Sequence, residues 1–311
     1  MNSVEKKTVA SAFKSLLRYQ LLLPVILAAL LILMAASYFT GKLLHTQHER
    51  FNVSIAYTIE TFVKHASREL DAIAFAMPNA FLEDTNMSMQ ALWFSHDLFD
   101  TLYLLDNHGV IETLVPIDQR YLGFDMSRSE YYLNVDCDRA LNISAPFSSL
   151  RTGEPTVYIS RCIDGGYLLV GELNLGALQE TTYAGQPSLS EASVFVVDQK
   201  GTILAHSDFD HVTRQDNISN WKIVDIGLEG ENPTFYYWHD SNFWFSTAES
   251  IQPMGWLVVT EIPFWVVYGP YLGATFVMII LLVIIFAIAI QRFSITAQQQ
   301  VVLPLTKLSQ S

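Results

Sequence analysis

Two long uncharged stretches divide this chain and restrict what it can fold into. Residues 21–39 contain no charged side chain, and neither do residues 262–291. About 20 apolar residues in a helix are needed to cross the hydrocarbon of a bilayer, so both stretches are long enough. We therefore predict transmembrane helices at 21–40 and 265–291, with the lipid bilayer as a partner and a water-soluble segment between them.

The charges outside these stretches predict the orientation of the chain. Residues 1–20 hold four basic residues and one acid, residues 292–311 hold two basic residues and no acid, and residues 42–261 hold 12 basic and 30 acidic residues. Basic flanks stay in the cytoplasm, so both termini are predicted there and residues 41–264 outside. The alternative is that residues 1–37 are a cleaved signal peptide, although their apolar run is longer than usual. The acidic excess also excludes nucleic acid as a partner of the central segment.

The segment after the first apolar stretch predicts one long periplasmic helix over 41–79. Apolar side chains return every three or four residues in an 11-residue repeat, which keeps them on one side of a nearly straight helix. They are Phe51, Ile55, Ile59, Phe62, Ala66, Leu70, Ile73 and Met77. Such a stripe must pack against apolar surface, either that of the chain's own domain or that of a second copy.

Two patterns occur twice between the predicted membrane helices. Four apolar residues, Asp-x-x-Gly and two further apolar residues stand at 102–111, and the pattern returns 92 residues later, at 194–203. A glycine followed by an apolar strand stands at 166–173 and returns 89 residues later, at 255–262. Each Asp-x-x-Gly pattern predicts a strand, a tight turn and a strand. The fold class is therefore predicted as α+β, with two tandem antiparallel-sheet modules after the long helix.

This organisation resembles the double Cache sensor domains, which are tandem PAS-like modules outside the membrane in bacterial receptors. The resemblance covers residues 41–264 and rests on the long helix, the two hairpins and several shorter motifs. These are Gly123–Ser127, Tyr131-Tyr132, Ser144-x-Pro146, Thr152–Val157 and the closing strand of each copy. The resemblance implies a membrane-distal module at 80–185 and a membrane-proximal module at 186–264.

The resemblance also implies what kind of protein this is. It implies a signal-transduction receptor in the bacterial inner membrane, with residues 1–20 in the cytoplasm as the charges predict. A homodimer is expected because the helical stripe and the membrane helices offer paired surfaces. Pro304–Leu308 looks like the opening of a HAMP linker, so residues 292–311 are expected to lead into a cytoplasmic output domain. That domain is expected to be a diguanylate cyclase or phosphodiesterase, a histidine kinase or a chemoreceptor signalling module.

A small-molecule site in the distal module follows from the same resemblance. Amino-acid-binding members look like Arg-x-Trp-Tyr, then Tyr-x-Asp, then a closing Asp. The corresponding positions here are Ser129, Tyr131, Tyr132, Phe147, Ser149 and Glu172. Because Ser129 takes the arginine position, the clamp for an α-carboxylate is missing, whereas aromatic rings with an acid fit an amine-bearing ligand. The alternative is that the rings pack in the core and that Glu172 is solvated.

No pattern predicts a catalytic site, a cofactor or a metal centre. His206, Asp208, Asp210 and His211 stand close together, but their position after a strand end favours a solvated turn over metal ligands. Three functions remain: the receptor, a membrane-anchored extracellular enzyme, and a periplasmic adaptor or structural protein that binds another protein.

The two cysteines, Cys137 and Cys162, both lie in the segment predicted to be outside. An oxidising compartment permits a disulfide there. Two small buried residues are the alternative, and the sequence leaves both open.

Overall fold

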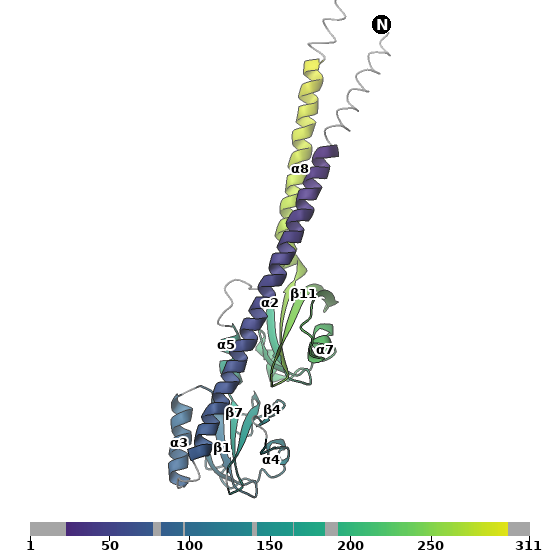
Figure 1. The fold of residues 1–311 in the computed structure, drawn as a ribbon. Helices are drawn as coiled ribbons and strands as arrows, with labels where there is room; N and C mark the ends of the chain where they lie inside the picture. The colour runs from purple at the N-terminus through teal and green to yellow at the C-terminus, as the bar shows by residue number, and fades with distance from the viewer. Residues whose placement is uncertain are drawn as a thin grey trace, which may run out of the picture. The chain divides into compact units, whose positions relative to one another are not determined.

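The computed structural model describes residues 23–76, 82–95, 97–138, 142–163, 165–183 and 192–297 (Figure 1). The predicted segment 1–20, the end of the long helix at 77–79, the module boundary at 185/186 and the HAMP-like motif at Pro304–Leu308 lie outside the described residues. The chain divides into two compact units. Thr46–Pro263 form one unit, which is called the sensor unit after its predicted resemblance to sensor domains, and the flanking segments, which end at His45 and resume at Phe264, form the helical unit.

Helix α2 spans Leu23–Ala76 and enters the sensor unit at Thr46. Most of the predicted apolar stripe is buried there, namely Ile55, Ile59, Ala66, Leu70 and Ile73, while Phe51 and Phe62 are half-buried and Met77 lies outside the described residues. The stripe belongs to one hydrophobic cluster with residues of both sheets, among them Leu102 and Val258. The chain's own domain therefore covers the stripe.

The first sheet has five antiparallel strands in the order β2-β1-β7-β6-β3. These are β1 (Phe99–Leu105), β2 (Ile111–Val115), β3 (Asn142–Ile143), β6 (Tyr158–Ile163) and β7 (Tyr167–Leu173). Strands β4 (Phe147–Ser148) and β5 (Pro155–Thr156) form a separate ribbon. The helices of this part of the chain are α3 (Leu82–Ser95), α4 (Glu130–Leu133) and α5 (Leu175–Tyr183).

The second sheet also has five antiparallel strands, in the order β10-β11-β12-β8-β9. These are β8 (Ser193–Val197), β9 (Ile203–His206), β10 (Thr234–His239), β11 (Asn242–Ile251) and β12 (Trp256–Pro263). Two short helices, α6 (Phe209–Thr213) and α7 (Lys222–Leu228), pack against this sheet. Counted along its own part of the chain, each sheet has the order second, first, fifth, fourth, third strand. The predicted duplication is therefore confirmed at the level of topology.

The repeated Asp-x-x-Gly pattern makes the same turn in both sheets. Asp106 accepts hydrogen bonds from the backbone amides two and four residues later, and Asp198 does the same. Gly109 has φ 81° and Gly201 has φ 79°. A Cβ at either glycine would lie within 2.8 Å of the backbone of a following serine, so both the conformation and the close approach require glycine.

Each sheet has two covered faces. One face packs against α2 in the shared cluster. The other face of the first sheet carries a cluster that includes Tyr103, Tyr158 and Val170, with Tyr132 of α4 packed against it. The corresponding face of the second sheet carries a cluster with α6 and α7, which includes Phe195. These second faces hold the candidate sites.

Cys137 and Cys162 form a disulfide with their Cα atoms 5.5 Å apart. The bond joins the segment after α4 to β6 in the first sheet. The alternative of two free thiols is therefore excluded.

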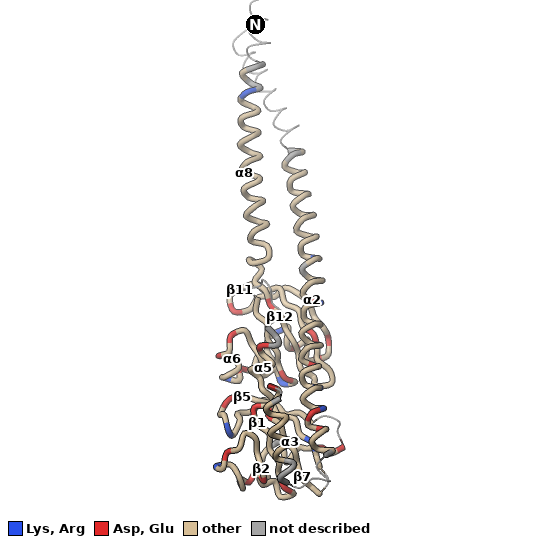
Figure 2. The backbone as a smooth tube through the Cα atoms, turned by 90° about the vertical axis from the view of Figure 1, so that its left-hand side faces the viewer, with Lys and Arg blue, Asp and Glu red and all other residues tan. Residues whose placement is uncertain are grey.

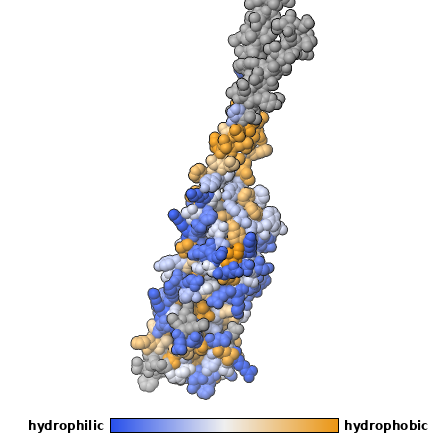
Figure 3. Space-filling view, turned by 45° about the vertical axis from the view of Figure 1, so that its right-hand side comes forward, coloured by the Kyte–Doolittle hydropathy of each residue, from blue (hydrophilic) through white to orange (hydrophobic). Residues whose placement is uncertain are grey.

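The helical unit consists of the first part of α2 and of α8 (Phe264–Ala297). Both helices are long and apolar enough to cross a membrane, and their most apolar windows are not buried by the described chain. Gly41 of α2 lies close to α8, because a Cβ there would be 2.8 Å from the hydroxyl of Tyr268. Arg292 is the one charged residue within α8, whereas Asp and Glu are spread over the sensor unit (Figure 2). On the face seen in Figure 3, hydrophilic residues cover most of the sensor unit and hydrophobic residues cover the described helical segments.

A buried amide anchors α2 to the second sheet. Asn52 is fully buried, donates a 2.7 Å hydrogen bond to the carbonyl of Thr247 on β11 and accepts one from the hydroxyl of Thr260 on β12. We predict that Asn52→Ala lowers the free energy of unfolding by about 2 kcal/mol, because both partners lose their hydrogen bonds inside the protein. Denaturant unfolding followed by tryptophan fluorescence measures this, with Ser54→Ala on the exposed side of α2 as the control. An equal, small effect of both substitutions would contradict the prediction.

The disulfide closes a segment of 25 residues. A cross-link over such a loop restricts the unfolded chain and stabilises the folded state by about 3 kcal/mol. We predict that Cys137→Ser combined with Cys162→Ser lowers the melting temperature, and that a reducing agent lowers that of the unchanged chain but leaves the double variant unaffected. A reductant effect of the same size on both proteins would argue against a stabilising bond.

Candidate functional site

Glu172 lies at the centre of the second face of the first sheet. It stands on β7, where the register pairs it with Thr101 on β1 and with Tyr158 on β6. The residue is 1% exposed. Its Oε2 accepts a 2.7 Å hydrogen bond from the hydroxyl of Ser149, which follows the ribbon strand β4. A carboxyl group is therefore enclosed on the face that also carries the apolar and aromatic cluster.

Burial raises the pKa of Glu172 above its usual value, because a charged carboxylate loses its hydration inside the protein. The hydrogen bond from Ser149, the nearby side chains of Thr101 and Tyr103 and the positive charge of Arg151 oppose that shift. The alternative that Glu172 is solvated is wrong, because its side chain is buried and hydrogen-bonded.

Arg151 is a candidate site residue that the sequence analysis missed. Its Nε donates a 2.8 Å hydrogen bond to the hydroxyl of Thr101, and its Nη2 donates one of 2.8 Å to the carbonyl of Asp100. Burial raises the pKa of Asp100 to about 6, and the charge of Arg151 opposes this. In the sequence, the signal that could have identified Arg151 is its position directly before the Thr152–Val157 motif. Thr101 thus lies between the guanidinium of Arg151, which donates to its hydroxyl, and Glu172, which is its partner on β7.

The predicted ligand residues fall into three groups. Ser149 and Glu172 are joined directly. Tyr132 and Phe147 pack against the cluster on the same face, where the ring of Phe147 lies 5.6 Å from that of Tyr158.

The hydroxyls of Ser129 and Tyr132 bond to backbone carbonyls and not to the carboxyl of Glu172. The hydroxyl of Ser129 donates to the nearby carbonyl of Met126 at 2.6 Å, which is a local turn contact. The hydroxyl of Tyr132 donates to the carbonyl of Asn107 at 2.9 Å. The side chain of Tyr131 lies outside the described part of the structure. Ligand binding by these six residues remains a prediction.

The second sheet repeats this arrangement around Glu261. This residue occupies the same place on β12 as Glu172 on β7, is 2% exposed, and pairs in register with Ser246 on β11 and Ser193 on β8. Its Oε1 accepts hydrogen bonds from the hydroxyls of Tyr237 and, at 3.0 Å, Ser246. Burial raises the pKa of Glu261 to about 7.

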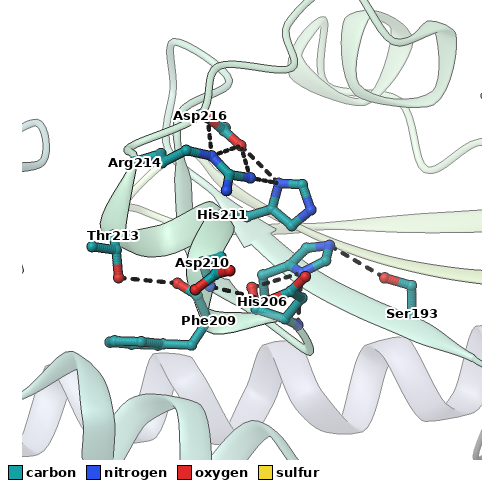
Figure 4. A network of polar contacts seen from close by, with 9 residues as sticks. Ser193, His206, Phe209, Asp210, His211, Thr213, Arg214 and Asp216 are labelled. Carbon is teal, nitrogen blue, oxygen red and sulfur yellow. Dashed lines mark hydrogen bonds and ion pairs between the residues drawn. The ribbon is translucent and has the colours of Figure 1, made fainter.

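The histidines of the second module form a polar network at the edge of the sheet (Figure 4). The Nε2 of His206 lies 3.3 Å from the hydroxyl of Ser193, and its Nδ1 accepts a 2.9 Å bond from the amide of Asp208. Burial lowers the pKa of His206 to about 4, which keeps the ring neutral and able to accept. His211 contacts Asp216 at 2.7 Å. Within the described ranges, no group of three or more His, Cys, Asp and Glu side chains is placed to hold a metal ion.

No protein-family model and no curated protein matches the chain. Solved structures do match. The extracellular domain of a protein described as a histidine kinase superposes with a TM-score of 0.62 at 16% identity, over 71% of this chain and 95% of that one. The ligand-binding domain of the Pseudomonas aeruginosa PAO1 amino acid chemoreceptor PctB, in complex with L-Arg, has a TM-score of 0.60 at 15% identity, covering 72% and 97%.

A third structure, the ligand-binding domain of the Campylobacter jejuni chemoreceptor Tlp3 with 4-methylisoleucine, has a TM-score of 0.57 at 14% identity, covering 73% and 93%. These neighbours are extracellular ligand-binding domains of the Cache type. The fold of the sensor unit is therefore the predicted double Cache fold.

The buried Glu261 should make stability depend on pH. Its folded-state pKa of about 7 lies above the ordinary value of 4.5, so the folded chain holds the proton more tightly and this contribution is lost as pH rises through that window. We predict that Glu261→Gln removes a decline in the free energy of unfolding of up to about 3 kcal/mol between about pH 5 and pH 8.

The measurement is denaturant unfolding at both pH values. The difference in free energy of unfolding between Glu261→Gln and the unchanged chain isolates the effect of Glu261. The pKa values of Asp100, Glu172 and His206 are also shifted, but they contribute equally to both proteins. Glu112→Gln, at an exposed position on β2, is the control. Parallel pH profiles of all three proteins would show that Glu261 titrates normally.

Proposed function

We propose that this chain is the sensory part of a two-pass membrane receptor that binds a small amine-bearing ligand in its membrane-distal module. The observation that carries the proposal is the buried carboxyl of Glu172 on the face shared with Tyr132, Phe147 and Tyr158. A carboxylate beside aromatic rings suits an ammonium group. The acidic outer segment concentrates cations near it.

Arg151 extends this ligand chemistry. The sequence indicated that the clamp for a carboxylate was lost at Ser129, but the guanidinium of Arg151 lies beside Thr101, next to Glu172. Its Nη1 makes no hydrogen bond to the described residues. A ligand that carries both an amine and a carboxylate would therefore find a partner of opposite charge for each group. The amino acids bound by the chemoreceptor domains named above belong to this class.

The route from the site to the membrane follows the chain. Strand β12 ends at Pro263 and α8 begins at Phe264, so no loop separates the second sheet from the apolar helix. A ligand that favours one arrangement of the sensor unit would bias the helices that leave it. We further propose that α2 and α8 cross the bacterial inner membrane with both termini in the cytoplasm, that the receptor is a homodimer, and that residues 292–311 lead through a HAMP-like linker to an output domain.

Thermal unfolding of the full chain in lipid nanodiscs tests the ligand class. We predict that an amine-bearing compound from a panel of amines, amino acids, organic acids and peptides raises the melting temperature by mass action. Glu172→Gln should weaken its binding about tenfold or more, because a charge-assisted hydrogen bond is lost. Arg151→Ala should weaken only ligands that carry an acid group.

Arg128→Ala is the matched control, since Arg128 is exposed and one position away from the predicted arginine. Unchanged affinity in both Glu172→Gln and Arg151→Ala would place the site elsewhere. A folded chain that no compound in the panel stabilises would favour the adaptor over the receptor.

A further inference from the structure

The second face of the second sheet gathers polar and aromatic groups around one carboxyl. Glu261 stands in register between Ser246 and Ser193 of the adjacent strands, and the hydroxyl of Ser246 donates to its carboxyl. Tyr237 on β10 reaches the same carboxyl across β11. The position repeats that of Glu172 in the first sheet, so the duplicated fold has placed an acid at the same point twice.

The two carboxyl groups differ in what balances their charge. The guanidinium of Arg151 lies near Glu172 and opposes the rise in its pKa that burial causes. Glu261 has no such partner: in the part of the chain that the structure describes, no Lys or Arg forms an ion pair with it. Both of its hydrogen bonds reach Oε1, and Oε2 accepts none from the described residues. A buried carboxylate with an unoccupied oxygen is costly unless a positive group joins it.

Tyr237, whose hydroxyl donates to this carboxyl, belongs to a group of aromatic rings. The rings of Trp221 and His239 have centroids 3.8 Å apart, and the ring of Tyr237 stacks with that of His239 at 5.8 Å. All three residues are half-buried, so none of the rings is fully closed off from solvent. Burial lowers the pKa of His239, which keeps its ring uncharged, and Asp240 adds negative charge in the next turn. Neutral rings around an acid attract a cation with an apolar body.

We propose that the membrane-proximal module holds a second ligand site, for a small organic ammonium ion, in which Glu261 binds the charged nitrogen and Trp221, Tyr237 and His239 surround it. This site is separate from the one proposed around Glu172. Without a ligand, the carboxyl group retains a proton near neutral pH, and the ammonium ion takes the place of that proton.

Binding at this site should therefore strengthen as pH rises. The titratable groups around the carboxyl are Tyr237 and His239 on β10, Asp240 in the following turn and His206 on β9, while β8 and β11 present the hydroxyls of Ser193 and Ser246. On α7, Lys222 lies over the ring of Phe235, 5.3 Å from its centroid. Of these groups, Glu261 has its pKa at about 7.

Calorimetric titration of the full chain in nanodiscs tests the proposal, with ethanolamine, putrescine and choline as probes. Glu172→Gln serves as the background because it disables the distal site. We expect this variant to bind at least one of the probes, and Glu261→Gln added to it to weaken binding about tenfold or more. No binding of any probe to the Glu172→Gln chain, or unchanged binding after Glu261→Gln, would overturn the proposal.

A second measurement needs no change at Glu261. In the Glu172→Gln chain, the affinity for the same probe should fall about tenfold between pH 8 and pH 6, because a carboxyl of pKa about 7 takes up a proton over that range. A pH-independent affinity would also overturn the proposal. The distal site is judged separately, since the unchanged chain should bind one more equivalent of its own ligand than Glu172→Gln does.

Discussion

Burial of the apolar stripe of α2 is the contact on which the sensor unit depends. One helix supplies Ile59, Ala66 and Leu70 to a single hydrophobic cluster that also contains core residues of both sheets. Neither sheet covers its own α2-facing side, so removal of the helix would expose apolar surface on both at once. The two modules therefore share a core although each has its own sheet.

The duplication explains why the site chemistry occurs twice and also why the two copies differ. Strand order, turn geometry and the acid on the last strand are common to both sheets. The loops and edge strands are not. The first copy brings Ser149 and Arg151 to Glu172 from the ribbon loop, whereas the second copy surrounds Glu261 with Tyr237 and Ser246 from its longer strands. A common scaffold thus supports two different environments for one residue type.

The sequence predicted the parts of the fold that depend on local patterns. The spacing of the α2 stripe, the paired Asp-x-x-Gly turns and the two apolar stretches each follow from periodicity or from backbone geometry, and the structure contains them. The environment of Glu172 could not be predicted in the same way. Its partner Thr101 lies on β1, whereas Ser149 and Arg151 lie in the loop after β4, far from Glu172 in the sequence.

The same limit applies to Glu261. The 89-residue repeat already aligned it with Glu172, but nothing in the local sequence showed that it is buried or that Tyr237 reaches it. The disulfide was left open for a related reason, because only the fold brings the two cysteines together.

The anchoring of Asn52 limits how motion can pass through the sensor unit. Its amide is held by β11 and β12 together, so α2 cannot slide lengthwise along the second sheet without breaking both hydrogen bonds. Lengthwise movement of α2 past the second sheet is therefore disfavoured. Any displacement of α2 that preserves both hydrogen bonds carries the second sheet with it.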